Sequence, residues 1–163
     1  MEWMRQTAKK IGLISDTHGF LRVEAMRALE GSDLIVHAGD VGNPEIIDAL
    51  KSLAPVKAIR GNIDTQPWAS ALPATAVVEA GHVLIYVLHD LHQLDLDPRA
   101  AGFHIVIFGH THKPASEEKS GVRYLNPGSA GPRRFQLPVS IARLDIGQTP
   151  WKIEIVNLLD SAV

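Results

Sequence analysis

Short runs of apolar, often β-branched residues recur along this chain, and each is soon followed by glycine or a charged residue. In the first third these runs lie at Ile11–Ser15, Asp33–His37 and Val56–Arg60. Runs of this length and composition are typical of buried strands. The segments between them have helical periodicity, and the order strand, helix, strand, helix, strand predicts parallel pairing with right-handed crossovers.

Two helices are predicted between these strands. The first covers Phe20–Glu30, where apolar residues recur at the helical period and Gly31 follows the last turn. The second begins after Asn43, because asparagine is a favoured N-cap and the proline that follows it suits the first helical position. This second helix is expected to extend to about Leu53.

The rest of the chain predicts more strands and little helix. Ala74–Ala80 and Val83–Leu88 flank the two-residue turn signal Gly81-His82, which predicts a β-hairpin. Leu96–Ala101 is expected to form a short helix, and Pro127–Pro138 a loop. The remaining strands are expected at His104–Phe108, Gly121–Leu125, Val139–Ile146 and Trp151–Leu159. The predicted fold is therefore α/β, with both parallel and antiparallel strands.

Composition narrows the class of protein. With 163 residues and 45% hydrophobic residues, the chain fits a single domain over 1–163, with residues 1–9 frayed. Its 16 basic and 18 acidic residues are interspersed and give a net charge of −2, so no surface for nucleic acid is expected. The absence of cysteine excludes disulfide scaffolds, thiolate zinc sites and cysteine nucleophiles.

The sequence predicts neither a membrane-spanning segment nor a targeting signal. Met1–Lys10 is polar and lacks the apolar core of a signal peptide. No apolar run approaches the ~20 residues that a membrane span needs. We therefore expect a cytoplasmic protein that does not bind membranes, and the sequence leaves a homo-oligomer open.

Seven side chains with metal-binding oxygen or nitrogen atoms lie where predicted strands end. They are Asp16, His18, Asp40, Asn62, His89, His110 and His112. Each short motif alone is also ordinary turn chemistry. Together they favour a metal site, because open α/β sheets place their ligands at the carboxyl ends of strands. Imidazole and oxygen ligands without sulfur suit manganese, with iron, zinc or nickel as alternatives.

The order of these motifs resembles the calcineurin-like metallophosphoesterase superfamily, and most closely its small single-domain prokaryotic phosphodiesterases. The family pattern is Asp-x-His, Gly-Asp, Gly-Asn, a histidine after a strand, and Gly-His-x-His. It spans Asp16 to His112 here, and the turn Asn126–Ser129 extends it. The resemblance implies two packed mixed β-sheets flanked by helices, an αββα sandwich. It also implies two divalent metal ions per chain and a small phosphate-ester substrate.

By the same resemblance, Asp40 would bridge the two ions. One metal position would be completed by Asp16, His18 and His112, and the other by Asn62, His89 and His110. Two metals about 3.5–4 Å apart acidify a water and clamp a phosphate, so we expect a metal-dependent phosphoesterase. The expected catalytic residues are Asp40, Asn62 and Asp64. Asp64 stands where phosphatase branches often carry a histidine acid, which favours phosphodiesters over monoesters.

Several residues near these motifs have two interpretations. The chain reads His89-Asp90-Leu91-His92 where the family commonly has His-Gly-His, so Asp90 either bonds a ligand imidazole or faces water, and the role of His92 is open. Arg133 and Arg134 either hold phosphate oxygens, or belong to a solvated loop or form a structural pair. His37 is expected to face the core or to support Asp40, and not to bind metal.

A second function on the same fold is a non-catalytic protein-binding scaffold. A subunit of the endosomal retromer coat resembles this family and works chiefly by holding partner proteins. Scaffolds of that kind tend to lose ligand positions, whereas this chain keeps all seven, including both histidines of Gly109-His110-Thr111-His112. The sequence therefore favours an enzyme.

Overall fold

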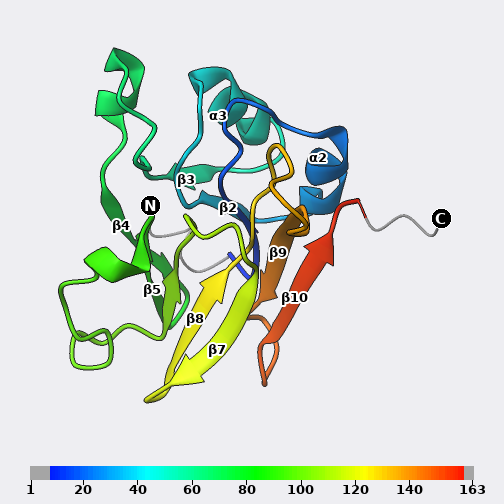
Figure 1. Ribbon diagram of the computed structural model, residues 1–163. Helices are drawn as coiled ribbons and strands as arrows, with labels where there is room; N and C mark the ends of the chain where they lie inside the picture. The colour runs from blue at the N-terminus through cyan, green and yellow to red at the C-terminus, as the bar shows by residue number, and fades with distance from the viewer. Residues whose placement is uncertain (1–7, 160–163) are drawn as a thin grey trace.

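Two five-stranded β-sheets pack face to face in the computed structural model, which describes residues 8–159 (Figure 1). The strand order is β10-β9-β1-β2-β3 in one sheet and β4-β5-β6-β8-β7 in the other. Both sheets contain parallel and antiparallel pairs. The predicted α/β fold with two packed mixed sheets is confirmed.

The first sheet is built from the two ends of the chain. Its strands are β1 (Lys10–Ile14), β2 (Leu34–His37), β3 (Val56–Ala58), β9 (Ser140–Asp145) and β10 (Lys152–Asn157). Strands β1, β2 and β3 run parallel, whereas β9 is antiparallel to both β1 and β10. Helices α2 (Val23–Leu29) and α3 (Pro44–Lys51) make the two crossovers. They lie together at the upper right of Figure 1, on the side of the molecule away from β7.

The second sheet contains the predicted hairpin. Its strands are β4 (Thr75–Ala80), β5 (Val83–Leu88), β6 (Ile105–Ile107), β7 (Ala115–Lys119) and β8 (Val122–Asn126). Strands β4 and β5 are antiparallel, with Ala80 opposite Val83 across the two-residue turn. Strand β6 runs parallel to β5 and β8. Two short 3₁₀ helices, η1 (Pro67–Ala71) and η2 (Leu91–Gln93), lie in the connections before and after the hairpin.

Local sequence accounts for how the helices begin and end. The Asn43 side chain accepts a hydrogen bond of 3.3 Å from the amide of Ile46, as an N-cap should. Gly31 follows α2 with a positive φ of 84°, a conformation that glycine adopts without steric cost. Helix α2 is shorter than predicted, because Phe20 and the two residues after it belong to the loop that leaves β1.

Two sequence-based predictions of local structure are wrong. Leu96–Ala101 forms turns rather than a helix, and the Asp97 side chain accepts from the amides of Arg99 and Ala100. Strand β7 was not predicted, because all five of its residues are half-buried or exposed and it has no apolar alternation. It is an edge strand, and charged side chains on an edge discourage pairing with other chains.

The core fills both faces of the central strands. Between the sheets, Leu13 and Val36 of the first sheet pack in one cluster with Ile85 and Ile107 of the second, and all are buried. A second cluster lies under α2 and α3. Strands buried on both faces hold their ends in place, and those ends carry the predicted ligands.

The described part of the chain begins at Ala8. The prediction that residues 1–9 are frayed falls mainly on residues 1–7, which lie outside the described residues. Ala8 is buried, and the amide of Lys9 donates to Asp33 Oδ2 at 3.0 Å. Among residues 8–159, no helix is both long and apolar enough to cross a membrane.

Candidate metal centre

The seven predicted ligands follow five strands, and the fold brings these strand ends together. Asp16 and His18 follow β1, Asp40 follows β2, Asn62 follows β3, His89 follows β5, and His110 and His112 follow β6. Neighbouring loops are tied through the backbone, since the amide of His18 donates to Asp40 O at 2.9 Å and that of Gly109 to His89 O at 2.9 Å. The predicted ligand side chains therefore converge from both sheets.

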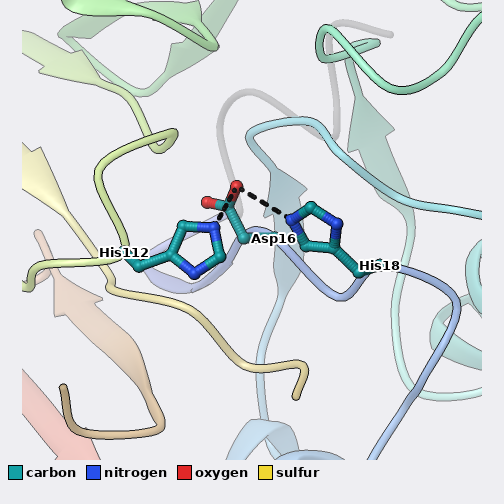
Figure 2. Close-up of side chains that lie close together, drawn as sticks. All are labelled: Asp16, His18 and His112. Carbon is teal, nitrogen blue, oxygen red and sulfur yellow. Dashed lines mark ion pairs between the residues drawn. The ribbon is translucent and has the colours of Figure 1, made fainter. Parts of the chain in front are cut away.

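Asp16 lies at the centre of the first group. Its Oδ1 is 3.7 Å from His18 Nε2 and 3.4 Å from His112 Nε2, and Figure 2 shows the carboxylate between the two rings. Its Oδ2 accepts hydrogen bonds from Ser15 Oγ at 2.7 Å and from the His110 amide at 3.1 Å. One oxygen thus anchors the side chain, and the other is directed at the histidines.

Asp40 lies between histidines of the two predicted metal positions. Its Oδ2 is 3.5 Å from His18 Nε2 and 3.2 Å from His89 Nε2. Its Oδ1 accepts a hydrogen bond of 3.1 Å from the amide of Ile63. This is the location that a carboxylate shared by two ions needs.

The second group is formed by His89, Asn62 and His110. His89 is buried and its Nδ1 donates to Ala38 O at 2.8 Å, so Nε2 is the nitrogen with a free lone pair in the neutral ring. His110 Nδ1 is 3.2 Å from Asn62 Oδ1, and the rings of His89 and His110 are 5.2 Å apart. His110 is the more exposed of the two, with 41% of its side chain accessible.

Four buried donor atoms in this cluster lack a hydrogen-bond partner within the described part of the chain. They are Asp16 Oδ1, His18 Nε2, His89 Nε2 and His112 Nδ1. Buried polar atoms in folded proteins almost always have a partner, so four orphans in one place call for an explanation. A bound cation explains three of them, Asp16 Oδ1, His18 Nε2 and His89 Nε2, because carboxylate and imidazole atoms are the donors that divalent transition metals take. The orphan atom of His112 is Nδ1, whereas the nitrogen that faces Asp16 is Nε2.

The donor atoms are also close enough for metal binding. The ligand atoms of Asp16, His18 and His112 all lie within 4.8 Å of one another, and so do those of Asp16, Asp40 and His89. Asp16 belongs to both groups. The residues present therefore fit a metal centre at this point of the fold.

The backbone of the ligands is strained. Seven non-glycine residues of the described chain have positive φ, and five of them are predicted ligands: Asp16 (57°), His18 (48°), Asp40 (56°), His110 (72°) and His112 (64°). Residues in this region cost of order 1–3 kcal/mol each and persist where the surrounding structure enforces them. Such strain clusters at functional sites, so the backbone indicates the same location as the side chains.

The electrostatics of the cluster favour cations. Burial opposes ionisation of Asp16, but contacts with His112 and His18 outweigh it and hold the pKa of this carboxyl well below its usual range. Burial likewise acts against the charged form of Asp40, yet bonds from His89 and from the Ile63 amide lower the pKa of Asp40. Burial would lower the pKa of His89, but Asp40 and Asp16 raise it. Two ionised carboxylates therefore lie within the buried cluster at neutral pH.

Comparison with known proteins identifies the family. Residues 10–149 match the sequence profile of the calcineurin-like phosphoesterase superfamily domain. The chain belongs to this superfamily. The resemblance drawn from its motifs is confirmed.

Named relatives and solved structures of this superfamily are similar over most of the chain. A protein of Methanocaldococcus jannaschii, named as a probable metallophosphoesterase, is 37% identical over 149 residues, which are 83% of this chain and 75% of the relative. A solved archaeal phosphodiesterase has a TM-score of 0.75 and 26% identity, over 90% of this chain and 99% of the other. A mutant Vps29 from Entamoeba histolytica has a TM-score of 0.70 and 25% identity, over 91% and 98% of the two chains.

Asp64 was predicted to be a catalytic residue. In the structure its carboxylate accepts hydrogen bonds from backbone amides. Its Oδ2 accepts from the amides of Gly61 at 2.8 Å and Val41 at 3.0 Å, and its Oδ1 from that of Gly42 at 3.0 Å. The side chain is buried. Asp64 therefore ties the loop that carries Asp40 to the loop that carries Asn62, which is the contact pattern of a positioning residue.

His37 and Thr17 form a second set of buried hydrogen bonds behind the ligands. The sequence had left open whether His37 faces the core or supports Asp40. The Gly39 amide donates to His37 Nδ1 at 3.1 Å, so the proton is on Nε2, which donates to Thr17 Oγ1 at 3.0 Å. Thr17 Oγ1 donates in turn to Val41 O at 2.8 Å. His37 thus both faces the core and supports the Asp40 loop, and burial lowers its pKa to about 4. The position of Thr17 between two ligands was the available signal for its role.

The end of β8 and the turn after it are hydrogen-bonded to the loops that carry Asp16, His110 and His112. Asn126 Nδ2 donates to Gly109 O at 3.2 Å and to Thr111 Oγ1 at 3.0 Å, and Ser129 Oγ donates to Asp16 O at 3.1 Å. Arg133, further along the loop, is exposed and donates to Leu137 O at 3.2 Å within the same loop. This contact does not involve the ligand cluster.

Proposed function

We propose that this chain is a metal-dependent hydrolase of small phosphodiesters that acts through two divalent ions, manganese foremost, as one domain in the cytoplasm. The observation that carries the proposal is the set of three unpartnered atoms that face one another at the site, Asp16 Oδ1, His18 Nε2 and His89 Nε2, which come from both sheets. A site built only for structural stability would leave no such atoms, because each costs about 1–3 kcal/mol when buried without a partner.

The residues divide between the two ions as the family resemblance implies. Asp16, His18 and His112 would hold one ion, Asn62, His89 and His110 the other, and Asp40 both. When bound, such a pair supplies an activated water and neutralises charge on the phosphoryl oxygens. The chain itself fixes the donors, through the bonds to Asp16 Oδ2, Asp40 Oδ1 and His89 Nδ1.

A cavity beside the second ligand group offers room for the substrate. It has a volume of about 370 Å³, is lined by Asn62, His89 and His110, and extends to Arg60 and Thr75. A second hollow of about 410 Å³ lies near Lys10, at the opposite end of β1 from Asp16, and is too distant to serve these ligands. A small phosphate ester fits the first cavity, whose size is at the lower end of ligand sites.

The preference for diesters rests on the contacts of Asp64. Its two oxygens are occupied by three backbone amides, so it does not supply a proton to a leaving oxygen. Without such an acid, an alkoxide leaving group is poorly assisted and activated esters react best. The solved archaeal relative is itself named as a phosphodiesterase.

The test is hydrolysis after controlled metal loading. Purified protein is stripped with a chelator, reloaded with manganese, and assayed with bis(p-nitrophenyl) phosphate and p-nitrophenyl phosphate. We expect about two ions per chain, turnover of the diester above that of the monoester, and loss of turnover with chelator. His82→Ala, in the exposed hairpin turn, is the control that leaves both ions and turnover unchanged.

The alternative is a protein-binding scaffold on the same fold. The similarity to Vps29 supports this alternative at the level of architecture. Two ions per chain without turnover of any activated diester, under any divalent metal, would favour it over the enzyme.

A further inference from the structure

The segment after β5 departs from the family pattern, since Asp90 stands where glycine is common. The function proposed above does not use this residue. In the structure Asp90 lies between two histidines, the predicted ligand His110 and the non-ligand His92. Its contacts distinguish the two roles that the sequence left open.

His110 presents its two ring nitrogens to two different partners. In the structure Nδ1 donates to Asn62 Oδ1 at 3.2 Å, because an amide oxygen only accepts, and Asn62 belongs to the predicted second metal position. Nε2 is 3.9 Å from Asp90 Oδ2. A neutral imidazole carries a proton on one nitrogen and a lone pair on the other, so only one of them binds a metal. The side on which the proton sits decides where the lone pair points.

The Asp90 carboxylate is held in place by the residues that follow it. Asp90 is the N-cap of η2, and its Oδ1 accepts from the His92 amide at 3.0 Å. The same oxygen is 3.3 Å from His92 Nδ1. Because Oδ1 is used in this way, Oδ2 is the oxygen left to face His110.

His110 needs such a partner more than the other ligand of its group does. His89 is buried, and the carbonyl of Ala38 fixes its tautomer. His110 is 41% exposed, and among the described residues Asp90 is the only group shown within ion-pair distance of its Nε2. Histidine ligands of metals almost always donate their other ring N–H to a carboxylate, carbonyl or water.

We infer that Asp90 is a positioning residue for His110: when a metal takes the place of the proton on Nδ1, beside Asn62, the Asp90 carboxylate accepts the proton that Nε2 then carries. At 3.9 Å the groups attract one another without a direct hydrogen bond, and a bridging water or a small rotation of the exposed ring completes the contact. His92 supports this arrangement by anchoring the other carboxylate oxygen. The inference rests on the proposed two-metal function.

The first measurement is a zinc titration of chelator-treated protein. Wild type should show two binding steps, and Asp90→Ala should weaken one of them about 10- to 100-fold while leaving the other unchanged. Asp90→Asn should lie between, because its amide oxygen still accepts from Nε2–H. Glu117→Ala removes an exposed carboxylate from the edge strand β7 and should match wild type.

The second measurement is the ¹⁵N spectrum of the histidine rings in the zinc-loaded protein, which a merely structural effect would not move. We expect a metal-bound Nδ1 and a protonated Nε2 for His110, with the tautomer no longer fixed in Asp90→Ala. Coordination through Nε2, or wild-type affinity for both ions in Asp90→Ala, would overturn the inference. Failure of the wild type to bind two ions would instead refute the proposed function, so the two failures are distinct.

Discussion

The backbone amide of His110 donates a hydrogen bond of 3.1 Å to Oδ2 of Asp16. His110 follows a strand of the second sheet and Asp16 a strand of the first, so this bond joins the two sheets at the site. Ser15 Oγ donates to the same oxygen, at 2.7 Å. Orientation of the Asp16 carboxylate therefore depends on how both sheets are placed relative to one another.

Asp40→Ala is expected to remove both ions. Oδ2 of Asp40 lies within 3.5 Å of His18 and His89, which belong to the two different metal positions. Metal analysis after dialysis should fall from about two ions per chain to well below one, with at least a 100-fold loss of diester hydrolysis, since a metal supplies several kcal/mol of transition-state stabilisation. Retention of two ions would remove Asp40 from the bridging position.

Thr17→Val is expected to destabilise the protein and weaken metal binding together. The substitution leaves His37 Nε2–H and the Val41 carbonyl buried without their partner, which costs about 1–3 kcal/mol of unfolding free energy. Thr65→Val is the matched control, because Thr65 is exposed and no described hydrogen bond involves its hydroxyl. Urea unfolding of the metal-free proteins measures the first effect and zinc titration the second. Equal stability of both variants would show that the hydrogen bonds of Thr17 to His37 and Val41 do not stabilise the fold.

Metal-free protein should lose stability as the pH falls from about 6.5 to 4. In this window the unfolded chain protonates His37, whose usual pKa is 6.5, whereas burial keeps the folded residue neutral until about pH 4. The unfolded state therefore binds more protons, and the unfolding free energy decreases by about 3 kcal/mol across the window. His89 acts oppositely and above this window, because Asp40 raises its pKa against the effect of burial.

Urea unfolding at successive pH values, in the presence of chelator, tests this dependence. His37→Asn should flatten the slope between pH 4 and 6.5, whereas His82→Gln, in the exposed hairpin turn, should keep it. An unchanged slope in His37→Asn would show that another group causes the dependence.

Diester hydrolysis should slow steeply as the leaving group becomes more basic. Asp64 accepts hydrogen bonds from three backbone amides. It therefore offers no carboxylic acid at the position where phosphatase branches often carry a histidine. A series of aryl phosphodiesters with phenols of increasing pKa measures the dependence in the metal-loaded enzyme. A flat dependence in a chemistry-limited step would reveal a general acid, and His92, 92% exposed near the site, is the first residue to replace.

The sequence predicted the strands best where burial on both faces makes them uniformly apolar, as in β1, β2, β5 and β6. It failed for β7, whose edge position is set by pairing with β8 and leaves no mark on its polar sequence. It failed also at Leu96–Ala101, where Asp97 caps a single turn that the chain does not continue.

At the site, too, features set by local sequence could be predicted, whereas contacts between distant segments could not. The seven metal-capable residues were found because each follows a recognisable strand. The supporting role of His37 was predicted only as one of two alternatives, because a buried hydrogen bond such as that from the Gly39 amide to His37 depends on loop conformations with positive φ. The contacts of Asp64 could not be predicted for the same reason, since its neighbours in sequence do not reveal the three backbone amides that donate to it.

The left-handed backbone of the ligands has a consequence for how this site can fail. Most side chains at these positions would relax toward right-handed or extended backbone if the loops were released, and the donor atoms would then point apart. Substitutions in the residues that support the ligand loops should therefore not produce sites of gradually decreasing intrinsic metal affinity. They should produce an equilibrium between molecules with an intact site and molecules with none, so that titrations report the full number of sites at an apparent affinity lowered by the intact fraction.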